Sequence, residues 1–124
     1  MLAHVSIQCA DFQKSAAFYD AVLAPLGGER LMQDGDDAIG YGFAPVPTFW
    51  IGRQRTGDGF RETHIAFQAA DRDQVRAFFE AAKAIGAEIL HEPDLWPQYH
   101  PTYYAAFVRD PDGNNVEAVS HTAE

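Results

Sequence analysis

The sequence HVSIQCAD at residues 4–11 returns as HIAFQAAD at residues 64–71, with His, Gln, Ala and Asp in the same positions. The likeness continues from FYDA at residues 18–21 to FFEA at residues 78–81. A repeat of this length that occurs only twice does not suit a solenoid, which needs at least about three repeats to bury a continuous core. The sequence therefore predicts a duplicated half-domain, with one histidine at the same place in each copy.

Each copy has the pattern of one strand, one helix and three further strands. Its first residues alternate polar and apolar side chains, as a strand with two different faces does, and the aspartate that follows is a preferred helix N-cap. An apolar stripe at helical spacing comes next, and short strand-like runs separated by Gly, Pro and Asp complete the copy. We expect helices after Asp11 and Asp71, and strands at residues 4–9, 29–33, 38–43, 48–52, 64–68, 88–91, 103–109 and 114–120.

The predicted fold class is therefore α+β, built from two βαβββ units. The units cover residues 1–53 and 63–120, and a polar link at residues 53–62 joins them. A length of 124 residues with 47% apolar residues allows one compact core and leaves no room for a second. We expect a single domain over residues 1–124.

Charge and cysteine content exclude several classes of partner and site. Nine basic and eighteen acidic residues give a net charge of −9, which repels nucleic acid and anionic lipid. No stretch approaches the ~18 apolar residues of a membrane span, and no cationic, then apolar, leader opens the chain, so we expect a cytoplasmic protein. A single cysteine, Cys9, excludes an intrachain disulfide and a thiolate cluster. Any metal must therefore use nitrogen and oxygen ligands.

Three residues have the chemistry of a metal site. His4 and His64 open equivalent strands, so a fold with approximate two-fold symmetry places them at equivalent points about one axis. Glu117 lies in an otherwise apolar strand, where a carboxylate is costly unless it is paired, solvated or bound to a cation. Two imidazoles and one carboxylate suit Fe(II), Mn(II) or Zn(II) with positions left open for substrate. The alternative is that both histidines are structural residues inherited from the duplicated unit.

The last two strands and the segment before them supply candidate catalytic residues. A turn at residues 110–113 that pairs Asp110 with Asn114 places Tyr103 on the face of Glu117, where its hydroxyl can orient substrate or donate a proton. The alternative for Tyr103 is an aromatic wall. Residues 92–101 contain three prolines and are expected to form an irregular loop that covers the open end of the sheet. His100 in this loop is the candidate acid or base, with a solvent-exposed histidine as the alternative.

The predicted substrate-binding residues are polar or aromatic side chains expected to line the cavity. The two glutamines either bind a substrate oxygen or satisfy each other. The set is Gln8, Gln68, Trp50, Trp96 and Phe107.

These residues resemble the vicinal oxygen chelate superfamily, which contains glyoxalase I, extradiol dioxygenases, fosfomycin-resistance thiol transferases and bleomycin-resistance proteins. The paired βαβββ units, His4, His64 and the closing DPDGNNVE at residues 110–117 all look like its pattern, and the match covers nearly the whole chain. The resemblance implies an incomplete, cup-shaped β-barrel with helices outside and a divalent metal (Zn, Fe, Mn or Ni) on His4, His64 and Glu117. Glyoxalase I has a further carboxylate on the fourth strand, whereas residues 49–51 here are Phe-Trp-Ile, so a three-ligand site is favoured.

The resemblance also implies a choice between two functions. One is a metal-dependent lyase, isomerase or dioxygenase that chelates two neighbouring oxygens of a small substrate. The other is a non-catalytic protein of the bleomycin-resistance type that sequesters a small, cationic molecule, which the acidic charge suits. The carboxylates of a glutathione-bearing substrate would require cationic side chains, and the only local cluster of such residues is Arg53, Arg55 and Arg61. A homodimer would cover the exposed sheet edges, and the two histidines then belong either to one chain or to two.

Overall fold

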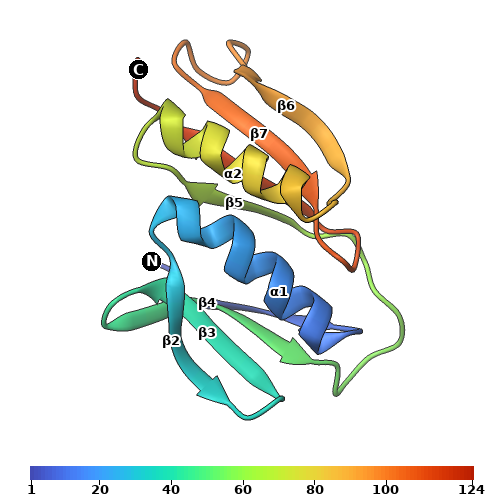
Figure 1. Ribbon diagram of the computed structural model, residues 1–124. Coiled ribbons are helices and arrows are strands. Elements are labelled where there is room, and N and C mark those ends of the chain that lie inside the picture. Colours follow the sequence, from blue (N-terminus) through green and yellow to red (C-terminus); the bar gives the residue numbers. More distant parts are fainter.

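The computed structural model describes residues 1–124 as two helices and two sheets (Figure 1). The first repeat contains β1 (Val5–Cys9), α1 (Phe12–Leu23), the short 3₁₀ helix η1 (Ala24–Leu26), β2 (Glu29–Asp34), β3 (Ala38–Phe43) and β4 (Val46–Arg53). The second contains β5 (His64–Gln68), α2 (Arg72–Ala84), β6 (Ile89–Leu95), β7 (Tyr104–Arg109) and β8 (Asn115–Ser120). None of the helices has both the length and the apolar character needed to cross a membrane.

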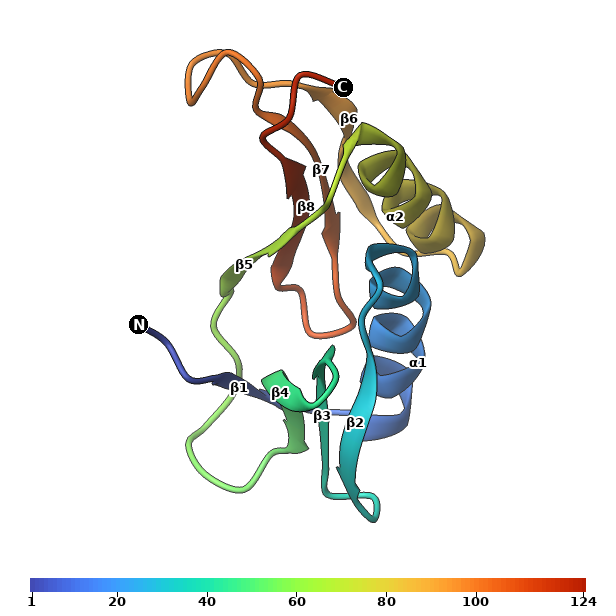
Figure 2. The same ribbon diagram turned by 90° about the vertical axis from the view of Figure 1, so that its left-hand side faces the viewer.

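The two sheets have the same topology, which confirms the duplicated βαβββ unit. Their strand orders are β1-β4-β3-β2 and β5-β8-β7-β6, and in each the first strand runs parallel to the last while the other pairs are antiparallel. The sheets do not close into a barrel. Figure 2 shows the two helices on one side of the molecule, and they pack against each other there. The opposite faces of both sheets are free to form a site.

Both helices begin at the aspartates that the sequence predicts. Asp11 accepts a hydrogen bond from the backbone N of Lys14 at 3.2 Å, and Asp71 accepts one from the backbone N of Gln74 at 2.9 Å. These bonds satisfy N–H groups that have no partner within the first turn of a helix. The side chain of Gln74 also accepts a hydrogen bond from the backbone N of Ala70 at 2.8 Å, which fixes the chain entering α2.

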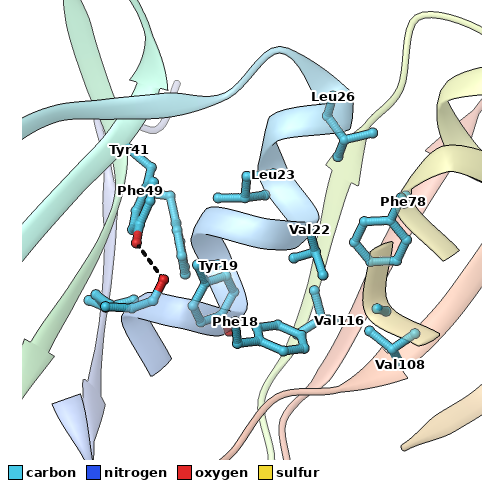
Figure 3. Close-up of a cluster of buried hydrophobic side chains, with 14 of the residues drawn as sticks. Phe18, Tyr19, Val22, Leu23, Leu26, Tyr41, Phe49, Phe78, Val108 and Val116 are labelled. Carbon is cyan, nitrogen blue, oxygen red and sulfur yellow. Dashed lines mark hydrogen bonds between the residues drawn. The ribbon is translucent and has the colours of Figure 1, made fainter. Parts of the chain in front are cut away.

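A single main core connects the two repeats. It contains 21 buried residues, and Figure 3 shows side chains of α1 between Phe49 of β4 on one side and Phe78 of α2 on the other. The rings of Phe49 and Phe67 meet edge to face at 5.1 Å, which joins the first sheet to β5 of the second. Aromatic pairs in this geometry add to the stabilisation from apolar burial. The repeats therefore share one core.

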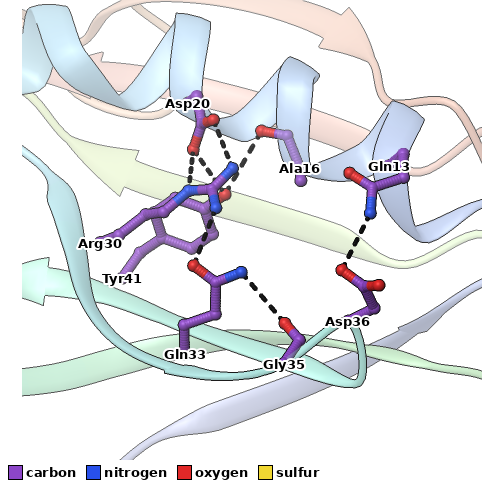
Figure 4. A network of polar contacts seen from close by, with 8 residues as sticks. All are labelled: Gln13, Ala16, Asp20, Arg30, Gln33, Gly35, Asp36 and Tyr41. Atoms are coloured by element: carbon purple, nitrogen blue, oxygen red, sulfur yellow. Dashed lines mark hydrogen bonds and ion pairs between the residues drawn. The ribbon is translucent and has the colours of Figure 1, made fainter.

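Polar contacts hold α1 to both halves. On the first, Arg30 contacts both carboxylate oxygens of Asp20, at 2.8 and 2.6 Å, and the hydroxyl of Tyr41 donates to the same carboxylate at 2.9 Å (Figure 4). On the second, the hydroxyl of Tyr19 donates to the buried Asp110 of the β7–β8 turn at 2.6 Å. The Tyr19 contact fixes the position of the β7–β8 hairpin, which bears the site described below.

The prediction of an irregular loop over residues 92–101 is wrong in its first part, because β6 continues to Leu95. Pro93 has no N–H to donate, and a proline is tolerated in a strand only at an edge or a bulge. β6 is the edge strand of its sheet, and its register with β7 shifts between His91 and Asp94, so that Pro93 pairs with no residue of the neighbour. The remaining element boundaries differ from the predictions by one or two residues.

Candidate active site

The centre of the site is the carboxylate of Glu117 in the middle of β8. Its side chain is buried, with 1% of the residue exposed. His64, at the start of β5, places Nε2 at 2.9 Å from Oε1, and the hydroxyl of Tyr103 donates to Oε2. A buried carboxylate requires such partners, since the loss of its hydration is costly. The structure thus brings together three of the residues that the sequence singles out.

The β7–β8 turn sets the register that makes this contact. The backbone N of Asp110 donates to the carbonyl of Asn114 at 3.1 Å, and Phe107 lies opposite Glu117. Side chains alternate between the two faces of a strand, so Tyr103 falls on the face of Phe107 and Glu117. This is the register expected from the sequence.

A cavity of about 330 Å³ opens beside Glu117, and most of its wall is aromatic. The rings of Trp96 and Phe107 meet edge to face at 5.2 Å, and the imidazole of His91 approaches both, at 5.0 and 5.5 Å. No lysine or arginine lines the cavity. Its lining residues, which we call the aromatic pocket, are His64, His91, Trp96, Tyr99, Tyr103, Phe107, Asn115 and Glu117.

Tyr103 keeps its proton in this environment. Burial, followed by the hydrogen bond to Glu117 and the negative charge of that carboxylate, raises the pKa of the Tyr103 phenol above its usual value of about 10. The phenol is therefore neutral at physiological pH and donates to Glu117. This arrangement holds the carboxylate in one orientation, towards His64.

His64 and Glu117 fit a divalent metal as two of its ligands. Divalent ions bind imidazole nitrogen and carboxylate oxygen at about 2.0–2.2 Å, so two neighbouring ligand atoms of one ion lie about 3 Å apart. The 2.9 Å between Nε2 and Oε1 agrees with that spacing. A third ligand is not at hand within one chain, because no group of three His, Cys, Asp or Glu side chains lies close enough to hold an ion. His4 precedes β1 and lines, with His64, a different cavity of about 430 Å³.

Several other predicted residues lie outside the aromatic pocket. Gln8 accepts hydrogen bonds from the backbone N of Arg55 and Thr56, at 2.9 and 3.2 Å, and so holds the link between the repeats. Gln68 lines a separate cavity of about 210 Å³. Trp50 packs across Gly40, where an added Cβ would lie 2.8 Å from the indole.

The loop after β6 brings Tyr99 to the pocket, and not His100 as the sequence predicts. His100 is exposed, and its Nδ1 accepts a hydrogen bond from the backbone N of Thr102 at 3.2 Å. Tyr99, one residue earlier, lines the pocket, as do Trp96 and Phe107, which the sequence also singles out. Sequence reasoning missed Tyr99 as a site residue, together with two further lining residues, His91 and Asn115. His91 reaches the pocket because it pairs with Phe107 across the sheet, a contact between separate strands that no local pattern in the sequence reveals.

Two of the three arginines that the sequence singles out in the link form ion pairs outside the pocket. Arg53 and Arg55 both pair with Asp37, at 3.3 and 3.2 Å. They therefore do not supply the pocket with positive charge.

Comparisons with known proteins agree with this architecture over nearly the whole chain. The family model for the Glyoxalase/Bleomycin resistance protein/Dioxygenase superfamily matches residues 1–118. A glyoxalase/bleomycin resistance protein from Albidiferax ferrireducens T118 superposes with a TM-score of 0.82 and 30% identity, over 94% of this chain and 96% of that one. A lactoylglutathione lyase from Agrobacterium tumefaciens has the same fold, with a TM-score of 0.69 and 19% identity over 94% and 90% of the two chains. No curated protein matches the sequence. With a duplicated βαβββ fold, a family match over 118 of 124 residues and a relative of 30% identity, the chain belongs to the Glyoxalase/Bleomycin resistance protein/Dioxygenase superfamily.

Proposed function

We propose that this protein is a metal-dependent enzyme that acts on a small oxygenated substrate in the aromatic pocket. The observation that carries the proposal is the contact of 2.9 Å between His64 and the buried Glu117 at an open cavity. A nitrogen and an oxygen ligand at this spacing suit Zn, Fe, Mn or Ni. The reaction class is that of a lyase, an isomerase or a dioxygenase, and the fold shared with a lactoylglutathione lyase supports this class.

The residues of the pocket have separate roles in this proposal. His64 and Glu117 hold the metal, which when bound acts as a Lewis acid on neighbouring substrate oxygens. Tyr103 holds its proton at the phenol oxygen and orients Glu117. Trp96 and Phe107 form a wall that excludes water from the reacting atoms.

The third ligand in this proposal is His4 of a second copy of the chain. The first sheet exposes apolar side chains, since Met32, Phe43 and Val46 are 56%, 66% and 57% exposed, and a homodimer would cover such a surface. His4 precedes β1 and belongs to no group of three metal-binding side chains within its own chain. In a two-fold dimer that brings His4 of each copy to His64 and Glu117 of the other, both metal sites have three ligands.

Metal titration tests the proposal directly. Zn²⁺ and Mn²⁺ are added to chelator-treated protein, and binding is measured by calorimetry together with the shift in the thermal midpoint. We expect binding near one ion per chain in the wild type and its loss in His64→Ala and Glu117→Gln. Asp58→Asn, which changes an exposed carboxylate of the link, is the control and should bind like the wild type. Wild-type protein that binds neither ion would refute the proposal.

Mixing two variants that have each lost metal binding tests whether the metal site is shared between two chains. His4→Ala and His64→Ala are each expected to bind no metal, but a mixed dimer has one intact site if the ligands come from two chains. Unfolding and refolding the two variants together should then restore part of the metal binding. If mixed dimers form but bind no metal, the three ligands are not divided between two chains.

A non-catalytic binding protein is the second candidate. It is favoured by the wall of the aromatic pocket, whose one carboxylate lies among aromatic rings with no lysine or arginine, a setting that suits a cationic ligand. A protein with this function would bind an organic cation with no metal present and would ignore added Zn²⁺ or Mn²⁺ in its thermal midpoint.

A further inference from the structure

We infer that the ligand of the aromatic pocket carries a flat aromatic ring and a neutral or cationic polar substituent, and that it has no acidic group. The inference rests on the proposed function for the location of the site. It goes further in naming the class of substrate, which neither the metal ligands nor the fold determines.

The first observation is a stacked pair of aromatic rings, held in place before any ligand binds, of which the outer ring, that of Tyr99, is largely exposed. The rings of Trp96 and Tyr99 are nearly parallel, with planes 10° apart and centroids 6.0 Å apart. Tyr99 is 63% exposed, so its ring is not there to fill the core. Backbone hydrogen bonds from Trp96 N to Tyr103 O at 2.8 Å and from Tyr99 N to Trp96 O at 3.0 Å fix the loop that carries both rings. Such preorganised rings bind another flat ring at little cost in conformational entropy.

The second observation is the sign of the charge around these rings. Glu117 is the one carboxylate of the lining, which contains no lysine or arginine, and its side chain is buried. Arg53 and Arg55 are paired with Asp37, and the chain as a whole has a net charge of −9. Apart from the proposed metal, a ligand carboxylate or phosphate would meet no lysine or arginine here. The metal-free pocket therefore disfavours acidic conjugates, such as those of glutathione.

The third observation concerns two buried polar atoms of the lining that have no hydrogen-bond partner. They are the indole N–H at Nε1 of Trp96, a donor, and Oδ1 of Asn115, an acceptor. Native proteins leave few such atoms unpaired. Both atoms are covered by neighbouring groups, so a ligand reaches them only when a side chain above them moves aside. A hydroxyl or amino substituent on the ring can serve either atom, as an acceptor for the indole or as a donor to the amide oxygen.

Three probes with the same phenol ring separate these features: tyrosol is neutral, tyramine is cationic and 4-hydroxyphenylacetate is anionic. Each is titrated into chelator-treated protein, with binding followed by the indole N–H resonance of Trp96, which is assigned with Trp96→Phe. We expect tyrosol and tyramine to bind about tenfold or more tightly than 4-hydroxyphenylacetate and to move that resonance. Binding of the anion as tightly as the neutral probe would overturn the inference.

Variants at Tyr99 test the ring platform. Tyr99→Ala should weaken tyrosol binding by about tenfold, whereas Tyr99→Phe keeps the ring and should bind like the wild type. Phe60→Ala removes an exposed aromatic side chain of the link, outside the pocket, and serves as the matched control. Equal binding of tyrosol to the wild type and to Tyr99→Ala would overturn the inference.

The same samples separate this inference from the proposed function. Metal binding without selective ring binding refutes the substrate class and leaves the metal-dependent function standing. Selective ring binding without metal binding refutes the metal-dependent function and leaves the substrate class standing.

Discussion

The hydrogen bond between Tyr19 and Asp110 predicts a large and measurable coupling between the two repeats. The carboxylate of Asp110 is 5% exposed and accepts four hydrogen bonds. They come from the hydroxyl of Tyr19 at 2.6 Å, the backbone N of Asp112 and of Asn114, both at 2.9 Å, and the side-chain amide of Asn114 at 2.8 Å. One carboxylate thus closes the β7–β8 turn and holds it against α1.

The magnitude follows from the number of donors left without a partner. Tyr19→Phe removes one hydrogen bond to a charged acceptor and leaves the other three, so we expect it to lower the free energy of unfolding by about 1.5–3 kcal/mol. Asp110→Ala removes the acceptor of all four donors, the hydroxyl of Tyr19, the side-chain amide of Asn114 and two backbone N–H groups, and we expect a loss of about 3–5 kcal/mol. In the double variant the two losses overlap, because the hydroxyl has no acceptor once Asp110 is gone. The coupling energy should therefore be about 1.5–3 kcal/mol.

Urea unfolding of the wild type, the two single variants and the double variant measures this coupling. The midpoint should move while the slope against urea concentration stays constant, which shows that the exposed surface of the unfolded state has not changed. Tyr41→Phe is the matched control. Its hydroxyl donates to Asp20, whose side chain is 41% exposed, and we expect that variant to cost less than about 1 kcal/mol. A coupling between Tyr19 and Asp110 below about 0.5 kcal/mol would refute the reasoning.

Two further predictions concern alkaline pH and glycine packing. Burial is the first cause that raises the pKa of three phenols above the unfolded value of about 10, so the stability they contribute is present below about pH 10 and is lost as the pH rises beyond it. The three are Tyr19, Tyr41 and Tyr103. The temperature of the thermal midpoint should decrease as the pH is raised from about 9 to 11, and the absorbance of these phenolates should appear only on unfolding. Ionisation of the three phenols in the folded protein would contradict the prediction. Gly42→Ala places a Cβ 2.7 Å from a carbonyl oxygen of β4 and should cost about 1–3 kcal/mol, whereas Gly52→Ala, with its nearest atom at 3.4 Å, should cost much less. Equal urea midpoints for these two variants would argue against that account.

Local signals in the sequence predict the elements well because they act over a few residues. Asp11 and Asp71 cap their helices through backbone groups only three positions away. The register of β7 and β8 depends on the turn at residues 110–113, so the meeting of Tyr103 and Glu117 follows from the chain between them. The extension of β6 past Pro93 depends instead on its place at the edge of the sheet, which no local pattern contains.

The parts of the site that the sequence did not reveal depend on contacts between distant segments. Trp96, Tyr99 and His100 all belong to one aromatic stretch, and which side chain enters the pocket is decided by the backbone hydrogen bonds of the loop. Histidine chemistry favoured His100, but the loop turns Tyr99 to the pocket. His91 reaches it because β6 pairs with β7 beside Phe107. Side-chain chemistry alone does not distinguish among residues so close together.

The two repeats differ at two pairs of structurally equivalent positions, and this difference creates the pocket. Trp50 lies opposite Ser6 in the first sheet, just as Glu117 lies opposite Ala66 in the second. The next strand places Gly40 beside Trp50, where any Cβ would collide with the indole.

In the second sheet the large and small residues are exchanged. Phe107 stands where the first sheet has Gly40, and it lies beside the smaller Glu117. The indole of Trp50 therefore spreads over its own sheet, whereas the carboxylate of Glu117 leaves a cavity with Phe107 as a wall. In the dimer proposed above, a second copy that places its first sheet over this cavity would supply, from the face of Trp50, both the cover of the pocket and the third metal ligand, a histidine, and the unequal repeats would then be complementary to each other.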